Sequence, residues 1–167
     1  MFTQNVNFTG GVIHIIDTVL TLPASDSSTA AAANLTSLAG ALTAAKLVQT
    51  VDFLSDVTIF SPSNAAFQAI GSAVGNLTTE QVTSILEYHV VQGTVGYSSS
   101  LSNTTLKTVN GANVTITIEN GTVFINSAKV LTPNVLVNNG VVHVIDGYAN
   151  FSLILYPSRR PFHLKHL

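Results

Sequence analysis

The side chains in this sequence that could do acid–base chemistry are histidines close to a carboxylate or an aromatic ring. His143 stands three residues before Asp146, and His89 follows an aromatic residue. On a strand, residues three apart point to opposite faces of the sheet, so we do not expect His143 and Asp146 to meet. Val141 and Ile145 alternate with His143 and place it on an apolar face, where a buried core histidine is expected.

The sequence offers weak support for a nucleophile or a metal site. It has no cysteine, no Gly-x-Ser-x-Gly segment and no glycine-rich phosphate loop. His163 and His166 have no cysteine or acidic neighbour that would complete a metal site. A serine triad built from distant residues stays open, because triads are defined by geometry and not by sequence order. We expect a protein that is not an enzyme and that binds no cofactor or metal.

Tyr88 and His89 can be interpreted in two ways. They stand where an amphipathic helix is predicted to end and a strand to begin. A buried imidazole there would hydrogen-bond to nearby backbone and fix the corner, because buried polar groups need partners. Alternatively, the pair would be contact residues on a binding surface. We favour the structural role for His89.

The composition indicates an apolar core beneath an uncharged polar surface. Hydrophobic residues make up 46% and charged residues 8% of the chain, against about 25% charged residues in an average domain. The net charge of −2 gives no reason to expect nucleic-acid binding. Asn-x-Ser/Thr, the N-glycosylation acceptor of secreted proteins, occurs more often than chance predicts. The candidate acceptors are Asn7, Asn34, Asn76, Asn103, Asn113, Asn120 and Asn150.

These acceptors predict a secreted protein. Residues 1–6 lack the basic start and apolar stretch of a signal peptide, and no apolar run reaches the ~18 residues that span a bilayer. We therefore expect only indirect membrane contact, through an anchor elsewhere in the gene, and interpret the chain as part of a longer protein. The basic tail at 149–167 receives no assigned role.

An internal repeat suggests how the chain is divided. Gly11-Val-Ile-His-Ile-Ile-Asp17 resembles Gly140-Val-Val-His-Val-Ile-Asp146, and the two lie 129 positions apart (140 − 11), about one domain length. We expect residues 1–23, with a strand at 12–22, to be the end of a preceding copy. Residues 24–33 are small and polar and read as a linker. Residues 34–148 would be a complete domain.

Periodicity predicts helices in the first half of that domain and strands in the second. Asn34 is expected to cap a helix with Leu35, Leu38, Leu42, Ala45 and Val48 on one face. A strand at 57–61 and a helix starting at 63 or 64 follow. Thr78 and Gln81 predict a capping box for a third helix.

The second half reads as antiparallel strands. Asn110-Gly111 and Asn120-Gly121 predict type I′ hairpins around a strand at 112–119. The first hairpin would place Lys107 opposite Val114, which fits poorly. Strands at 128–137 and 141–146 complete a mainly antiparallel sheet packed with several helices, an α+β fold.

Three blocks of this chain resemble the fasciclin-like domain family. They are the segment from Thr58 to Phe67, the Tyr88-His89 pair, and the segment from Asn139 to Asp146, in the family's order over residues 34–148. The family's motif positions are matched here by Thr58, Phe60, Ser61, Pro62, Asn64, Phe67, Gly140, His143 and Asp146.

The resemblance implies a β-wedge packed with helices. It also implies a secreted, usually glycosylated protein of the cell surface or cell wall, which often carries the domain in tandem. It also implies adhesion through contact with extracellular proteins or glycans, without catalysis. Members that bind integrins often carry Asp-Ile where this chain has Asn134-Val135, which puts that contact in doubt. The alternative is a carrier of a small lipid-like ligand, which would need an apolar pocket of several hundred Å³. A hydrolase is the third hypothesis, and it would need a Ser or Asp beside a histidine in an open cleft.

Overall fold

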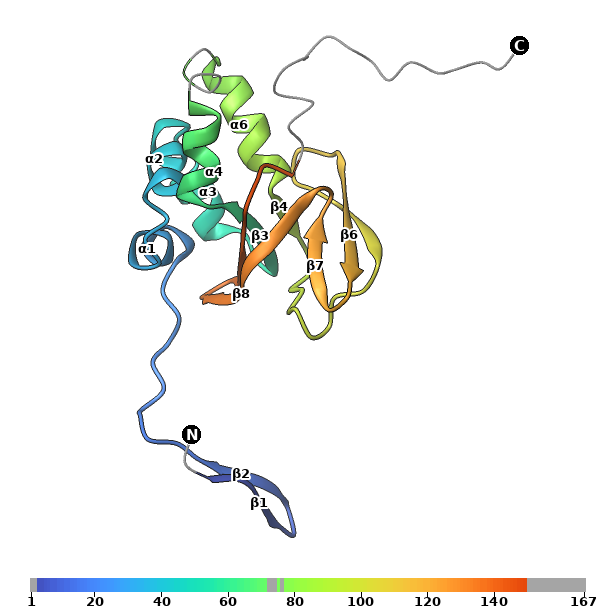
Figure 1. The fold of residues 1–167 in the computed structure, drawn as a ribbon. Coiled ribbons are helices and arrows are strands. Elements are labelled where there is room, and N and C mark those ends of the chain that lie inside the picture. Colours follow the sequence, from blue (N-terminus) through green and yellow to red (C-terminus); the bar gives the residue numbers. More distant parts are fainter. Residues whose placement is uncertain (1–2, 72–74, 76, 150–167) are drawn as a thin grey trace, which may run out of the picture.

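The computed structural model describes residues 3–71, 75 and 77–149. The chain forms a small N-terminal hairpin, a group of helices and a large sheet (Figure 1), and one strand of the large sheet lies between two of the helices along the chain. None of the described helices is long and apolar enough to cross a bilayer. The helices are α1 (Asp26–Ala32), α2 (Thr36–Ala44), α3 (Val48–Phe53), α4 (Asn64–Ala69) and α6 (Thr79–Tyr88). The strands are β1 (Thr3–Phe8), β2 (Gly11–Ile15), β3 (Val57–Pro62), β4 (Val90–Gln92), β5 (Thr104–Lys107), β6 (Asn113–Glu119), β7 (Thr122–Ile125), β8 (Ala128–Val137) and β9 (Gly140–Ile145).

The large sheet has seven strands in the order β4-β3-β9-β8-β7-β6-β5. Its neighbouring strands run antiparallel, except that β3 and β9 are parallel, with Val57 opposite Gly140 and Phe60 opposite His143. The parallel pair brings together two segments that are more than 80 residues apart in the chain. The prediction of an α+β fold with a mainly antiparallel sheet is confirmed.

Two apolar clusters cover the two faces of the central strands. The first joins α1, α2, α3 and α6 to one face of β3 and β9, through residues such as Leu38, Val51 and Ile59. The second packs Phe60 and Ile145 against Ile116 and other residues of β6 and β7. Because both faces are covered, every residue of β3 is buried. This explains why apolar and polar residues do not alternate along β3 and β9, and why Thr58, Ser61 and His143 on these strands are buried as well.

The predicted linker at 24–33 is wrong, because most of it forms helix α1. The Ser25 side chain caps this helix by accepting a hydrogen bond from the Ser28 backbone amide. The alanines that looked like linker are good helix formers, and Ala30 is buried in the first cluster. The stretch is therefore part of the domain, and the linker prediction failed because small residues suit a closely packed helix as well as a flexible segment.

The predicted cap at Asn34 is also wrong. Asn34 has a φ of 57°, the left-handed conformation that Asn and Gly adopt after a helix C-terminus, and it follows the C-cap Ala33 of α1. The N-cap of α2 is Leu35, and Val48 begins the separate helix α3. The predicted apolar face is confirmed for four of its residues, because Leu35, Leu38, Leu42 and Ala45 are buried.

The N-terminal strand predicted at 12–22 is shorter and belongs to a hairpin. β2 ends at Ile15 and pairs antiparallel with β1, while residues 16–25 contain no helix or strand. In Figure 1 the hairpin lies apart from the domain.

One of the two predicted hairpin turns has a different geometry. Asn120 and Gly121 both have positive φ values, 50° and 76°, which confirms type I′. At the other turn only Gly111 is positive, at 89°, and Thr108 pairs with Ala112 around a three-residue loop. This shifts the register by one residue, so Leu106 and not Lys107 faces Val114.

The predicted capping box of α6 is confirmed. The Gln81 amide donates to the Thr78 hydroxyl, and the Thr78 amide donates to the Gln81 side chain. Because Thr78 is exposed, Thr78→Ala should act through the cap and lower the free energy of unfolding by about 1 kcal/mol. Urea denaturation of unglycosylated protein measures this. Thr79→Ala, one residue inside the helix, should change it by less than about 0.5 kcal/mol, and an equal loss in both variants would contradict the assignment.

Candidate functional site

The motif residues on β3 are buried and serve the packing of the domain. The Thr58 hydroxyl donates to the Thr94 carbonyl at 2.7 Å and accepts from the Gly96 amide at 2.8 Å, which fixes the loop after β4. Phe60, Ser61 and Pro62 are buried beside it.

Asn64 and Phe67 connect α4 to its neighbours. The Asn64 side chain accepts from the Ser37 amide at 3.0 Å and donates to the Asn34 carbonyl at 2.6 Å. The Phe67 ring meets the Tyr148 ring edge to face, with the ring centroids 5.3 Å apart. Both residues therefore join α4 to segments distant in sequence.

His89 is a buried corner residue with both ring nitrogens engaged by backbone. Its side chain is 4% exposed, Nδ1 lies 2.7 Å from the Ile85 carbonyl, and Nε2 accepts from the Ala149 amide at 3.3 Å. Only the neutral tautomer with hydrogen on Nδ1 satisfies both bonds. Burial lowers the pKa of His89 to about 4, so the ring is neutral at physiological pH.

Tyr88 is buried as well and ties the same corner to the sheet. Its hydroxyl donates to the Asn113 carbonyl at 2.8 Å and accepts from the Asn126 side chain at 2.9 Å. Asn126 also donates to the Ala149 carbonyl. With Tyr88 and His89 both buried, the alternative that the pair forms a surface contact has no support in this geometry.

His143 and Asp146 have separate surroundings: His143 lies within β9, and Asp146 directly follows that strand. His143 is 1% exposed, its Nε2 lies 2.8 Å from the Gly96 carbonyl, and its ring stacks on Phe60 at 5.9 Å between centroids. Burial lowers its pKa. Asp146 is exposed and accepts from the Lys129 amide at 2.8 Å. The two side chains do not form an acid–base pair.

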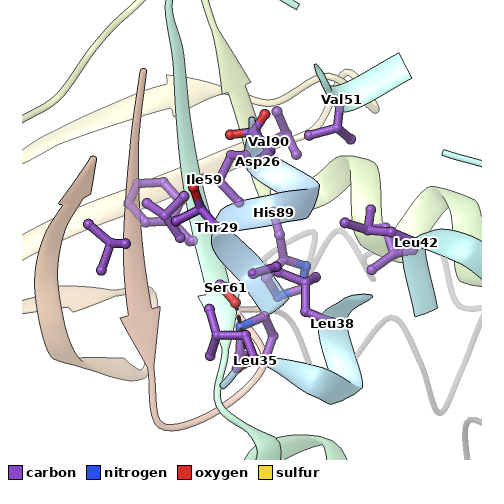
Figure 2. Close-up of a pocket in the computed structure, with 16 residues that line it drawn as sticks. Asp26, Thr29, Leu35, Leu38, Leu42, Val51, Ile59, Ser61, His89 and Val90 are labelled. Carbon is purple, nitrogen blue, oxygen red and sulfur yellow. Dashed lines mark hydrogen bonds between the residues drawn. The ribbon is translucent and has the colours of Figure 1, made fainter. Parts of the chain in front are cut away.

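A cavity beneath α1 gathers the three side-chain types of a hydrolase but not their geometry. Asp26, Ser61 and His89 all line it, among apolar side chains (Figure 2). The Ser61 hydroxyl donates to the Pro62 carbonyl at 3.3 Å. Both ring nitrogens of His89 are hydrogen-bonded to backbone groups, the Ile85 carbonyl and the Ala149 amide. His89 therefore cannot accept a proton from Ser61 as a general base does.

The size of this cavity bears on the carrier hypothesis. Its volume is about 30 Å³, room for a water molecule or two. A surface groove along α2 and α6, lined by Ala41, Ala45 and Val82, has about 260 Å³. Neither reaches the several hundred Å³ expected of a lipid-like ligand. Across the residues that the structure covers, no three metal-ligating side chains gather; His163 and His166 lie outside them.

Asp26 and Asn139 form a buried polar contact that the sequence did not reveal. The Asn139 side-chain nitrogen donates to Asp26 Oδ2 at 3.0 Å and to the carbonyls of Val51 and Leu54 at 3.0 and 2.9 Å. Burial raises the pKa of Asp26 to about 6, against the hydrogen bond from Asn139, which lowers it. Ser25 followed by Asp26 is a helix-start pattern that could have revealed α1.

Asn134 and Val135 lie at an irregularity of β8, where its pairing with β9 shifts register. Asn134 has a φ of 60° and is exposed. Its side chain accepts from the Ser98 amide at 2.8 Å and donates to the Ser98 hydroxyl at 2.7 Å. Val135 is half-buried against the first cluster, so only Asn134 of this pair is presented at the surface.

The candidate glycosylation sites within the described residues are exposed. Three of them belong to β5, β6 and β7 or their connections, and the Asn103 side chain accepts from the Ile118 amide at 2.7 Å. Asn76 and Asn150 lie outside the described residues. The exposed acceptors are Asn7, Asn34, Asn103, Asn113 and Asn120.

Comparison with known proteins gives related sequences in fungi and bacteria. A fasciclin-like arabinogalactan protein of Arthroderma benhamiae is 43% identical over 145 residues, which cover 87% of this chain and 34% of that protein. A protein of the same description from Cercospora beticola is 34% identical over 145 residues, 86% of this chain and 39% of that protein. Immunogenic protein MPB70 of Mycobacterium bovis is 36% identical over 104 residues, 59% of this chain and 53% of that protein. The chain thus spans well under half of the two fungal relatives.

A solved structure shares the fold. The FAS1 domain pair of the insect cell adhesion molecule Fasciclin I matches with a TM-score of 0.66 and 22% identity, over 86% of this chain and 57% of that chain. The profile of the Fasciclin domain matches residues 33–148, which include the buried histidines and the β3–β9 pair. The chain therefore belongs to the fasciclin domain family.

Proposed function

We propose that this chain is a secreted, glycosylated adhesion module of the cell surface or cell wall, acting by contact with proteins or glycans. The observation that carries the proposal is that the motif histidines and Tyr88 are buried and hydrogen-bonded within the fold. Contact with a partner would therefore have to be made by other residues, at the surface of the domain. The names of the relatives, fasciclin-like arabinogalactan proteins, support the same assignment.

The contact surface we favour lies where the β8 irregularity meets the loop after β4. We call it the β8 surface and define it by Tyr97, Asn134 and Leu136. Tyr97 and Leu136 are 42% and 53% exposed, and the two hydrogen bonds between Asn134 and Ser98 hold the two segments together. Exposed aromatic and apolar side chains around a fixed polar group are typical of binding surfaces.

The positions of the glycan acceptors support the same choice. Asn113 and Asn120 stand at the two ends of β6, and Asn103 precedes β5. Sugars on these residues would cover the β5–β6–β7 part of the sheet. β8 itself carries no acceptor, so the β8 surface would stay accessible to a partner.

A pair of surface substitutions tests the proposal. Leu136→Ser should lower the binding of chain-coated beads to one another and to a glycan array by about tenfold or more, the effect of losing one central apolar contact. Phe53→Ser removes another exposed apolar side chain, 84% exposed on α3, and should leave binding unchanged. The free energy of unfolding of both variants should stay within about 0.5 kcal/mol of the wild-type value.

Two results would contradict the proposal. If the wild-type chain bound neither beads nor glycans, adhesion by this module would be wrong. If Phe53→Ser lowered binding and Leu136→Ser did not, the contact would lie on the helices and not on the β8 surface.

A further inference from the structure

Three asparagines of this chain directly precede a glycine, and the fold holds their side chains differently. They are Asn110, Asn120 and Asn139. In an Asn-Gly pair the glycine backbone nitrogen can attack the side-chain carbonyl carbon of the asparagine, because glycine has no Cβ to hinder the approach. The attack requires a side-chain amide that can turn toward the following residue. Hydrogen bonds to that amide therefore decide where the reaction can occur.

The side chains of Asn110 and Asn139 are held by hydrogen bonds. Asn110 Oδ1 accepts from the Ala112 amide at 2.9 Å, and its Nδ2 donates to the Ser84 carbonyl at 3.0 Å. Asn139 Nδ2 makes the three bonds described above, and the Asn139 backbone carbonyl accepts from the Val57 amide at 3.0 Å. Each of these side chains must break two or more hydrogen bonds before it can reach its glycine.

Asn120 is not held in this way. It is exposed, and its side chain makes no hydrogen bond to any residue that the structure describes. It forms the turn between β6 and β7 together with Gly121, and Glu119 pairs with Thr122 across this turn. A Cβ added at Gly121 would have no other atom within 4 Å, so the surroundings leave room for ring closure. The end of a hairpin also opens locally at low cost.

We propose that Asn120 is a site of spontaneous deamidation and that an N-glycan on the same residue prevents it. The Gly121 nitrogen forms a bond to Asn120 Cγ and gives up its proton, and Nδ2 leaves as ammonia. A water molecule then opens the resulting five-membered imide ring and leaves aspartate or isoaspartate at position 120. Water is the only other reactant.

The glycan acts at the leaving group itself. Asn120 and Thr122 belong to one of the candidate N-glycosylation acceptors, and the sugar is attached to Nδ2, the atom that has to leave. A sugar there makes the leaving group bulkier and holds the side chain out in solvent, which hinders ring closure. This part of the proposal rests on the glycosylation proposed above.

Isoaspartate at position 120 would disrupt the turn. The main chain then runs through the side-chain carbon of this residue, which adds one atom to a two-residue loop. Type I′ geometry depends on a positive φ at both loop residues, so the pairing of Glu119 with Thr122 would be lost. The damage would begin at the open end of the β6–β7 pair, whose Ile116 and Ile125 belong to the second cluster.

Incubation of the chain made without N-glycans tests the deamidation. Peptide mass spectrometry near neutral pH should show Asn120 converting at least about tenfold faster than Asn110 or Asn139, because those two must first break hydrogen bonds. In guanidinium chloride, where the fold is lost, the three Asn-Gly pairs should convert at similar rates. The proposal is overturned if Asn120 is not the fastest of the three in the folded protein, or if its lead is as large in the denatured chain.

The secreted, glycosylated chain tests the protection. An endoglycosidase that leaves one sugar on each asparagine is used, because complete enzymatic removal of the glycan would itself convert Asn to Asp. Sugar-bearing Asn120 should stay unconverted over the time in which the bare residue converts. Thr122→Ala removes the acceptor but keeps Asn120 before Gly121, and it should restore conversion. The matched control Thr115→Ala removes the acceptor at Asn113 and should leave Asn120 protected.

The two parts of the proposal can fail separately. Conversion of sugar-bearing Asn120 at the rate of the bare residue overturns the protection. A secreted chain without sugar on Asn120 overturns both the protection and the proposed glycosylation of this residue. The deamidation of bare Asn120 is decided by the first measurement alone.

Discussion

Replacing Gly140 by alanine is expected to abolish the native fold or to destabilise it by at least about 3–5 kcal/mol. A Cβ at Gly140 would lie 1.9 Å from the carbonyl oxygen of Val57 and 2.8 Å from its carbonyl carbon. These are backbone atoms of β3, opposite Gly140 in the parallel pair, so no side-chain rotation relieves the contact. The strands would have to separate where the two apolar clusters meet. Circular dichroism and urea denaturation measure the loss.

Gly40 provides the matched control. It lies exposed within α2, and a Cβ there has no other atom within 4 Å. Gly40→Ala should therefore stabilise the protein by up to about 1 kcal/mol, the helix-propensity difference between the two residues. If Gly140→Ala unfolds at the same urea concentration as the wild type, the close approach of β3 and β9 is not as described.

The sequence predicted best those elements whose pattern is local. β6, β8 and the helix α6 follow from alternation, from turn residues and from a capping box within a few positions. What it could not supply is the parallel pairing of β3 with β9, because no local pattern tells which distant strand lies alongside. The fasciclin resemblance implied a β-wedge packed with helices and did not specify this pair.

Helix α1 and the role of Tyr148 show where sequence reasoning failed. A run of Ala and Ser suits a loose segment, and only the burial of Ala30 and Asp26 shows that it packs as a helix. Tyr148 lay at the end of the recognised domain, yet its buried ring contacts both Phe67 and His89. Such contacts depend on the tertiary fold, which overrides local propensity.

For the candidate site, the structure limits the roles that the residues singled out from the sequence can have. His143 was expected in the core and lies there with Nε2 on the Gly96 carbonyl. Asn139 was noticed only as the start of a motif, although its side chain joins Asp26 to two carbonyls. A side chain that donates to backbone carbonyls leaves no sequence pattern, because any residue can supply those partners.

The buried carboxyl group of Asp26 should make stability depend on pH. Burial raises the pKa of Asp26 from 3.8 to about 6, so the folded protein holds this proton more tightly than the unfolded chain does. Where the folded state binds more protons, stability falls as pH rises. The contribution of Asp26 is therefore fully present below pH 4 and is lost as the pH rises through about 6.

Asn139→Ala is expected to lower the free energy of unfolding by about 3–5 kcal/mol at pH 7.5. It removes three hydrogen bonds and leaves the ionised Asp26 without its donor. The loss should be about 1–2 kcal/mol smaller at pH 4, where Asp26 is protonated in the folded state and an unpaired charge no longer has to be buried. Urea denaturation at the two pH values measures both quantities.

Two further variants separate the charge from the packing. Asn138→Ala removes the same side chain from the exposed neighbouring position and should change stability by less than about 0.5 kcal/mol at either pH. Asp26→Asn combined with Asn139→Ala carries no buried charge, so, compared with Asp26→Asn alone, the cost of removing the Asn139 side chain should be the same at pH 4 and pH 7.5. If Asn139→Ala costs the same at both pH values, the buried carboxylate is not what Asn139 stabilises, and its role is confined to the carbonyls of Val51 and Leu54.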